Sequence, residues 1–362
     1  MVISVPLDED SPGRNLENPF VRRKGVSGVK KSEERITFTD RLAEQARIKR
    51  SVLCLGLDPF FEMMPPYLKR KIGDSGKSFE TMGELFERCM APVIDAAAPH
   101  AIAAQANLAS YLIYGETGVR AYRRILAHAE KRGLATIGDA KCAEGDYMAE
   151  TARDGYLGAV PFWDTPDREP RDRHESSIRS DAVTVTMAMG SSGMAPFAVA
   201  AREWGAGVFV LARPSFKTNS EFDLLRVGTH GEFLWEWIGH QARKFVKGTE
   251  GRCGWWNVGV TCGATFPNEM RKLREILPHS WIHVVGFGKQ GGTAENAVAA
   301  VDGEGRGCLV VSSRAITYAW HRGRFKRRSE EFAEAAGDAA RAARDDLNRA
   351  TERVLEKRKK AQ

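Results

Sequence analysis

Eight short apolar runs, most of them followed by a segment with helical spacing, constrain the fold of this chain more than any other feature. The apolar runs lie at Val52–Leu57, Ala101–Asn107, Leu134–Asp139, Ala182–Thr186, Val208–Ala212, Val258–Ala264, Ile282–Gly288 and Cys308–Ser312. Helical spacing marks Phe38–Arg50, Phe79–Ala97, Gly118–Arg132, Ala195–Trp204, Phe233–Phe245 and Asn268–Leu277. Near-continuous apolar strands that alternate with helices are typical of a parallel sheet covered on both faces.

Eight such units over roughly 270 residues favour a (β/α)8 TIM barrel over an open doubly wound sheet, which stays the alternative. We expect one α/β domain over residues 38–325, with a charged insertion at 162–180 before the fourth strand. A flexible N-terminal extension at 1–37 precedes it, and an exposed, charged C-terminal helix at 326–362 follows it. Thr39 is the expected N-cap of the first helix.

The charge distribution and the lengths of the apolar runs limit which partners and which cellular locations are expected. The 54 Lys and Arg exceed the 47 Asp and Glu, but much of the surplus lies at the two ends, in residues 22–24, 30–31 and 357–360. Charged tails are usually solvated, and no aromatic-interleaved basic repeat is present, so we expect no nucleic-acid partner. The N-terminus does not resemble a signal peptide, and no apolar run reaches the roughly 18 residues of a membrane span.

The six cysteines contain no CxxC pair and no cluster with histidines that would predict a metal site. Their positions are Cys54, Cys89, Cys142, Cys253, Cys262 and Cys308. Free thiols are typical of a reducing compartment, so a cytoplasmic location is expected.

Asp139 and Lys141 follow the apolar run 133–138 in the order Asp-x-Lys. Side chains alternate along a strand, so both are expected on one face. For an isolated Asp-x-Lys a plain surface ion pair is the usual explanation. The rest of the chain favours a functional pair, because ionised groups gathered at a strand end need partners.

The seventh and eighth runs carry the residues of an anion site. Gly286–Gly292 is rich in glycine, and the eighth run ends in Ser312-Ser313-Arg314. Barrels commonly bind phosphate at the loops after strands seven and eight. A glycine-rich loop alone is usually a tight turn. Next to an arginine fork it predicts a phosphate site.

From about Ser51 to Ala319 the chain resembles orotidine 5'-monophosphate decarboxylases of the longer bacterial subgroup. The matching pieces are Cys54–Pro59, Asp139–Lys141, Asp181–Val185, Gly207–Leu211, Val260–Thr265, Gly286–Gly292 and Ser312–Arg314. Their order and spacing carry the resemblance, which implies a lyase that forms UMP without a metal or organic cofactor.

The resemblance also implies roles. Asp58 would hold a ribose hydroxyl, Asp139 would lie against the substrate carboxylate, and Lys141 would protonate ring carbon six as carbon dioxide leaves. Ser215 would contact the pyrimidine edge. The implied phosphate ligands are Gln290, Gly291, Gly292 and Arg314. A homodimer is implied as well, in which the carboxylate at position 144 completes the neighbouring subunit's site.

Two members of the family's Lys–Asp–Lys–Asp tetrad differ in this chain. The subgroup writes Lys-Pro-Asn-Leu-Ala-x-Tyr where this chain has residues 105–111, so Gln105 replaces a lysine. Glu144 stands where the second aspartate is expected, and a different register would use Asp146. Replacing lysine by glutamine removes a positive charge that separates two carboxylates. Glutamate is also one methylene longer, and about 1 Å of misplacement can cost roughly 100-fold in rate.

Three hypotheses follow for the catalytic residues Asp139, Lys141, Gln105 and Glu144. The first is a working orotidine monophosphate decarboxylase with a compensated tetrad. The second is a diverged enzyme with the same phosphate site that acts on another nucleotide or ribose phosphate. The third is a non-catalytic nucleotide-binding protein. The Asp-x-Lys pair favours an enzyme, because a simple binding protein has little use for a lysine directed at the ring.

Overall fold

The computed structural model describes residues 36–361 except Ser75, 162–172, Lys217, Asn219, 229–230, Lys289 and Arg322. Nearly all of the expected N-terminal extension, and residues 162–172 of the expected insertion, lie outside the described residues. The rest of the insertion includes β5 (Arg173–Glu175), which pairs antiparallel with β4 (Ala159–Pro161) beside the main sheet.

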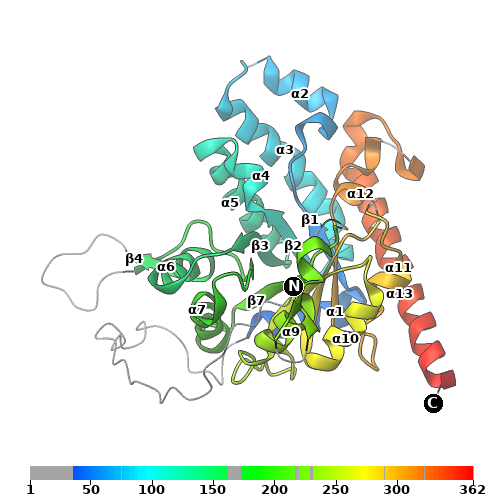
Figure 1. The fold of residues 1–362 in the computed structure, drawn as a ribbon. Helices are drawn as coiled ribbons and strands as arrows, with labels where there is room; N and C mark the ends of the chain where they lie inside the picture. The colour runs from blue at the N-terminus through cyan, green and yellow to red at the C-terminus, as the bar shows by residue number, and fades with distance from the viewer. Residues whose placement is uncertain are drawn as a thin grey trace, which may run out of the picture.

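Eight parallel strands close into a barrel, so the predicted TIM barrel is confirmed (Figure 1). The strands are β1 (Leu53–Gly56), β2 (Ala103–Asn107), β3 (Ala135–Cys142), β6 (Ala182–Val185), β7 (Gly207–Arg213), β10 (Trp256–Gly263), β11 (Ser280–Val285) and β12 (Cys308–Ser312). They follow one another around the barrel in sequence order, and β12 closes against β1. Each strand overlaps one of the eight apolar runs, because the backbone of a covered parallel sheet is flanked by apolar side chains on both faces.

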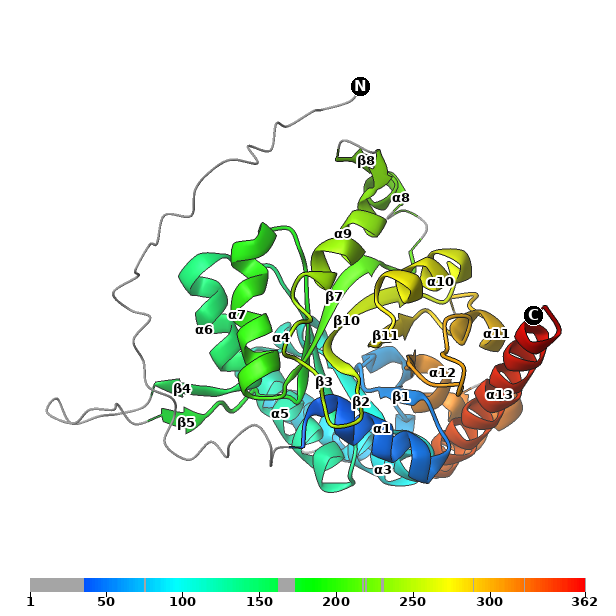
Figure 2. The same ribbon diagram turned by 90° about the horizontal axis from the view of Figure 1, so that it is seen from below.

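Helices surround the barrel and connect its strands (Figures 1 and 2). They are α1 (Phe38–Lys49), α2 (Pro66–Gly73), α3 (Phe79–Ala97), α4 (Leu108–Leu112), α5 (Gly115–Lys131), α6 (Asp146–Leu157), α7 (Gly190–Glu203), α8 (Ser220–Asp223), α9 (Leu234–Arg243), α10 (Pro267–Ile276), α11 (Ala294–Ala297), α12 (Arg314–Thr317) and α13 (Phe332–Ala361). A small hairpin of β8 (Arg226–Val227) and β9 (Glu232–Phe233) lies between α8 and α9.

The core has two parts. The larger part fills the space between the barrel and its helices. The smaller part fills the barrel interior and includes Phe38 and Leu42 of α1 packed with Phe209 and Trp281. Phe38 meets Phe209 edge to face, with ring centroids 5.8 Å apart. Helix α1 therefore closes the end of the barrel where the strands begin, which leaves the carboxyl ends of the strands for a site.

The start of α1 differs from the prediction. Thr37, not Thr39, is the N-cap, and its side chain and that of Asp40 form a reciprocal capping box. Thr39 lies inside the helix and is buried, and its hydroxyl donates a hydrogen bond to the carbonyl of Trp255 at 3.1 Å. Both threonines suit a cap by type, and only the tertiary contact decides between them.

The expectation of an exposed C-terminal helix is wrong for one face of α13. This helix runs along the outside of the molecule (Figure 2) and packs on α3. Phe332 and a row of alanines are buried in that contact. A Cβ atom on Gly337 would lie 3.2 Å from the Cβ of Ala96, so small residues let the two helices approach closely. Among the described residues no helix is long and apolar enough to cross a membrane.

Candidate active site

The Asp139–Lys141 pair lies at the carboxyl end of β3. Lys141 Nζ is 2.6 Å from Asp139 Oδ2, and the lysine side chain is 47% exposed while the aspartate is mostly buried. Asn107 Nδ2 donates to the same Asp139 oxygen at 2.9 Å, and the Thr184 hydroxyl donates to Oδ1 at 2.8 Å. The carboxylate is thus held from three neighbouring strands, β2, β3 and β6.

Lys141 has an unusual backbone for a non-glycine residue, with a φ of 46°. The pairing of β3 with β6 shifts register between Gly138 and Cys142, and the Lys141 amide donates to the Thr184 hydroxyl at 2.9 Å. Left-handed conformations cost energy for residues with a Cβ and concentrate at functional sites. The irregular end of β3 directs the Lys141 ammonium onto Asp139 while leaving it open to solvent.

Asp58 lies on the next part of the same rim, after β1. Its carboxylate accepts hydrogen bonds from the backbone amide of Asn107 at 3.0 Å and from the Ser313 hydroxyl at 3.0 Å. Asn107 therefore joins Asp58 to Asp139. The resulting chain of hydrogen bonds runs over five adjacent strands or their ends, from Ser313 after β12 to Thr184 on β6.

The pKa values of the two carboxylates shift in opposite directions. Burial raises the pKa of Asp58, and the hydrogen bonds from Asn107 and Ser313 offset only part of that rise. Burial also acts to raise the pKa of Asp139, but the charge of Lys141 and the hydrogen bonds to Lys141 and Thr184 outweigh it and hold the pKa below its ordinary value. The site therefore holds Asp139 as a carboxylate paired with an ammonium.

Gln105 lies two residues before Asn107 on β2 and is buried inside the barrel. Its side-chain oxygen is placed at hydrogen-bond distance from Nε2 of His283 on β11. The other ring nitrogen, Nδ1, lies 3.0 Å from the Thr261 hydroxyl of β10. Gln105 pairs in register with Ile137 and Asn107 with Asp139, so the Gln105–His283 contact lies one layer below the carboxylates.

Ser215 and Gln290 meet on the opposite side of the barrel mouth. The Ser215 hydroxyl donates to Gln290 Oε1 at 2.6 Å, joining the loop after β7 to the glycine-rich loop after β11. Gly286 has a φ of 83°, and a Cβ there would lie 2.6 Å from the Cβ of Ser215. Only glycine fits this position. The amides of Gly291 and Gly292 donate to carbonyls within the loop, at Gly288 and Gly286.

Arg314 begins α12, directly after β12. Its guanidinium carbon lies 5.7 Å from the ring centroid of Phe60. Within the described ranges the side chain of Arg314 makes no hydrogen bond and no ion pair, while its carbonyl accepts from the Tyr318 amide at 3.4 Å. A Cβ on Gly288 would lie 3.9 Å from the Cβ of Ala315, so the glycine-rich loop and the start of α12 are neighbours.

Glu144 is not brought to the Asp139–Lys141 pair within one chain. Its side chain is exposed, and it makes no hydrogen bond or ion pair in the part of the chain that the structure describes. Its backbone carbonyl faces Gly193 of α7. Asp146, the residue of the alternative register, is also exposed and begins α6.

Arg213 does not enter the site as a free cation. The side chain is 2% exposed, forms an ion pair with Asp223 at 3.0 Å and donates to the Ser220 hydroxyl at 3.1 Å. It also lies over the Phe266 ring at 3.7 Å. This arginine ties α8 to the end of β7. Lys217 lies outside the described residues.

Five residues of this constellation were assigned no role from the sequence. They are Asn107, Thr184, Thr261, His283 and Ser313. Each is polar and lies in or directly after an apolar run, and this position is the feature of the sequence that could have indicated a role in the site. Their partners are on other strands, so sequence alone does not pair them.

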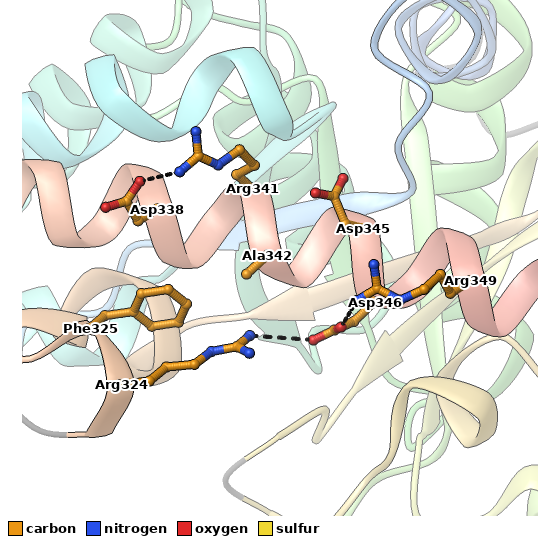
Figure 3. Close-up of a pocket in the computed structure, with 8 residues that line it drawn as sticks. All are labelled: Arg324, Phe325, Asp338, Arg341, Ala342, Asp345, Asp346 and Arg349. Atoms are coloured by element: carbon orange, nitrogen blue, oxygen red, sulfur yellow. Dashed lines mark hydrogen bonds and ion pairs between the residues drawn. The ribbon is translucent and has the colours of Figure 1, made fainter.

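A separate hollow of about 360 Å³ lies on the outer helical layer, beside α13. Figure 3 shows Arg324 directed at Asp346 and Arg341 at Asp338, so arginines and carboxylates neutralise one another there. None of the predicted site residues lines it. Within the described ranges no group of three or more His, Cys, Asp or Glu is placed to hold a metal ion.

Similarity to known proteins identifies the family of this chain. The sequence profile of the Orotidine 5'-phosphate decarboxylase / HUMPS family matches residues 51–323. The chain belongs to this family. An orotidine 5'-phosphate decarboxylase of Rhodopirellula baltica is 31% identical over 318 residues, which cover 86% of this chain and 98% of that protein. The Thermomicrobium roseum protein of that name is 33% identical over 88% of this chain and 98% of its own.

The fold of the family is shared too. The structure of the Leishmania donovani OMP decarboxylase superposes with a TM-score of 0.64 at 22% identity, covering 88% of this chain and 99% of that chain. At this identity the likeness supports the barrel alone.

Proposed function

We propose that this chain decarboxylates orotidine 5'-monophosphate to UMP. The Asp139–Lys141 ion pair, 2.6 Å long at the carboxyl end of β3, carries the proposal. Relatives that align over nearly their whole length are named orotidine 5'-phosphate decarboxylases, which supports the same activity. The reaction places UMP formation within pyrimidine nucleotide synthesis.

The chemistry needs a cation and a proton at one point. As the bond from ring carbon six to the carboxylate breaks, the electron pair stays on carbon six and carbon dioxide leaves. The Lys141 ammonium stabilises this carbanion and then gives its proton to carbon six. Asp139 holds the ammonium in place before the substrate arrives, and its own charge opposes the substrate carboxylate.

Substrate binding would use the rest of the rim. In this proposal Asp58 accepts a hydrogen bond from a ribose hydroxyl, and Ser215 turns from Gln290 to the pyrimidine edge. Arg314, Gln290 and the Gly291–Gly292 backbone take the 5'-phosphate. The amides of these two glycines donate to carbonyls within the loop, so the phosphate would compete with those hydrogen bonds. Binding energy from the dianion would then drive closure of the site.

We also propose a homodimer packed over the carboxyl face of the barrel. Several large apolar side chains are exposed in the segments that follow β2, β3, β6 and β7. They are Leu112, Ile113, Tyr147, Met148, Met189, Phe216 and Phe222. Such a group of exposed apolar side chains on one face is a feature of interaction sites. A symmetric pair would bring Glu144 of one subunit to the Lys141 of the other.

The activity is tested by UMP formation from orotidine 5'-monophosphate, followed by the loss of absorbance of the substrate ring. Turnover by the wild type, abolished in Lys141→Ala, is the expected result. A protein that binds UMP but releases no carbon dioxide would contradict the proposal.

Mixing tests the shared site. Lys141→Ala and Glu144→Ala should each be inactive alone. Random exchange of subunits gives about half heterodimers, each with one intact site, so the mixture should regain about a quarter of wild-type activity. No recovery after verified exchange would place Glu144 outside the partner's site.

Sedimentation tests the dimer itself. Ile113→Glu, at a side chain that is 71% exposed, should convert the dimer to monomers. Ile48→Glu is the matched control, since Ile48 is 57% exposed on α1 at the opposite end of the barrel. An active wild-type monomer at micromolar concentration would remove the dimer.

The proposal involves no cofactor and no nucleic acid. A cytoplasmic location is part of it, because a reducing compartment keeps thiols unpaired, and all six cysteines are free thiols.

A further inference from the structure

The Gln105 amide could lie in the barrel with either its oxygen or its nitrogen toward His283. An amide presents an acceptor at one end and a donor at the other, and its partners decide which end faces which way. Gln105 Oε1 is taken by His283. Its Nε2 has no hydrogen-bond partner among the described residues. The donor end is therefore free for a ligand in the barrel mouth.

The His283 ring is held so that it fixes this choice. Thr261 lies at Nδ1 at 3.0 Å, Gln105 lies at Nε2, and the ring stacks at a tilt on Phe209 with centroids 5.0 Å apart. A neutral imidazole has one N–H, so two arrangements satisfy both contacts. Either Nε2–H donates to the Gln105 oxygen and Nδ1 accepts from Thr261, or all the hydrogen bonds run in the opposite direction.

The charge above the ring selects the first arrangement. Asp139 and its partner Lys141 lie one layer higher, and both interact electrostatically with His283, the carboxylate more strongly than the ammonium. In the first arrangement the free end of the Gln105 amide carries the N–H groups, which a carboxylate in the layer above attracts. In the second arrangement that end is the oxygen, which the carboxylate repels. Burial lowers the pKa of His283 to about 4, so the ring is neutral at ordinary pH and either tautomer is open to it.

We propose that Thr261, His283 and Gln105 form a positioning relay, in which His283 locks the Gln105 amide with its N–H groups toward the Asp139–Lys141 pair. A neutral amide donor then meets the ligand carboxylate at that point. His283 is a positioning residue, because it acts through Gln105 and does not touch the ligand. The catalytic consequence rests on the proposed decarboxylase function, whereas the orientation of the amide does not.

A double-mutant cycle tests the relay in the full-length protein. His283→Phe keeps a ring on Phe209 but removes the donor, and Gln105→Met keeps the length but removes the amide. Each change should lower kcat about 10–100-fold, the value of one hydrogen bond to a charged group, with KM changed by less than about threefold. The double variant should be no worse than the worse single variant.

Rescue and a packing control separate positioning from folding. His283→Gln places an amide donor near the original Nε2 and should recover most of kcat. Leu309→Val alters a buried neighbour of His283 in register on β12 and should leave kcat within about twofold. Equal losses in Leu309→Val and His283→Phe, or additive losses in the cycle, would overturn the relay. If His283→Phe does not fold, Thr261→Val, which removes only a hydroxyl, replaces it in the cycle.

A ligand-free readout distinguishes failure of the relay from failure of the proposed function. Nitrogen NMR of the His283 ring should give the Nε2–H tautomer in the wild type, with an altered Nε2 signal in Gln105→Met. An Nδ1–H tautomer overturns the relay whether or not the protein turns over. A wild type with the Nε2–H tautomer and no decarboxylation refutes the decarboxylase function and leaves the orientation standing.

Discussion

The two halves of the barrel mouth differ in how their charges are compensated. On the half formed by β1, β2, β3 and β6, Asp58 and Asp139 are hydrogen-bonded and Lys141 is paired before any ligand arrives. On the other half, Arg314 has no anionic partner within the described ranges, and the glycine-rich loop bonds to itself. The first half is preorganised, and the second offers a free charge.

This difference separates binding from chemistry. A cation without a protein partner is available to a dianionic phosphate, so the second half should supply affinity. The Asp139–Lys141 ion pair is already formed, so it should add little to the affinity for a ligand whose ring is uncharged, such as UMP. The first half should instead stabilise charge at the reacting carbon. Changes in the two halves should therefore affect different measurements.

The largest expected effect is at Lys141. Lys141→Ala should lower kcat by about 10⁴-fold or more, because both proton transfer and charge stabilisation are lost. UMP affinity should change less than about threefold, since UMP carries no carboxylate at carbon six. Lys272→Ala, which removes an exposed lysine paired with Glu275 on α10, is the matched control. Equal loss of UMP affinity and kcat in Lys141→Ala would erase the distinction between the halves.

Arg314→Ala should show the opposite pattern. UMP affinity should fall by about 2–3 kcal/mol, the value of a charge-assisted bidentate contact, while uridine binding stays unchanged. Titration calorimetry with both ligands measures the difference. Arg324→Ala is the control, because Arg324 is already paired with Asp346 in the hollow beside α13 (Figure 3). If UMP and uridine bind the wild type alike, there is no phosphate site.

The fold was predictable because a (β/α)8 barrel repeats one local signal. Each apolar run forms a strand because both of its faces are covered, and an error in the predicted bounds of one strand does not change the number of strands. Errors arose where tertiary contacts decide. Thr39 resembles a cap, but its hydroxyl bonds to Trp255 and Thr37 takes the cap. The C-terminal helix is rich in charge, but its alanines pack on α3.

The site was predictable at its strand ends and less so across the barrel. Asp139 and Lys141 are two residues apart, so strand periodicity predicts them on one face. The left-handed backbone of Lys141, which brings its ammonium onto Asp139, was not predictable from that spacing. His283 lies 178 residues from Gln105, and only barrel closure brings the two into contact. The sequence showed that position 105 is not a lysine, but it did not show that Gln105 pairs with the neutral ring of His283.

The relay gives the site a specific acid sensitivity. Burial lowers the pKa of His283 from 6.5 to about 4, so the unfolded chain takes up a proton near pH 6.5 that the folded protein refuses. Stability attached to the neutral ring is therefore present above pH 6.5 and is lost as pH falls toward 4. Between pH 7 and 5 this loss is about 2 kcal/mol.

Urea unfolding at pH 7 and 5 measures this sensitivity. The wild type should lose about 2 kcal/mol more stability than His283→Gln, whose side chain does not titrate. The pKa of Asp139 is also lowered, but its ordinary value of 3.8 already lies below this pH range, so Asp139 changes little between pH 7 and 5 in either protein. An identical pH dependence in the two proteins would mean that the ring is not held neutral.

The smallest expected effect comes from restoring the family's charged pattern. Gln105→Lys with Glu144→Asp should leave kcat equal or raise it up to about tenfold, because an ammonium adds a full positive charge next to the carboxylates, which a neutral amide lacks. The introduced lysine would separate Asp139 from the partner's carboxylate, and His283 can accept from it through Nε2. Gln105→Lys alone measures the lysine's share. If the wild type lacks decarboxylation and the double variant gains it, the natural substrate is another nucleotide or ribose phosphate. If neither turns over but both bind UMP tightly, the protein is a non-catalytic nucleotide binder, and the contrast between the two halves is one of affinity alone.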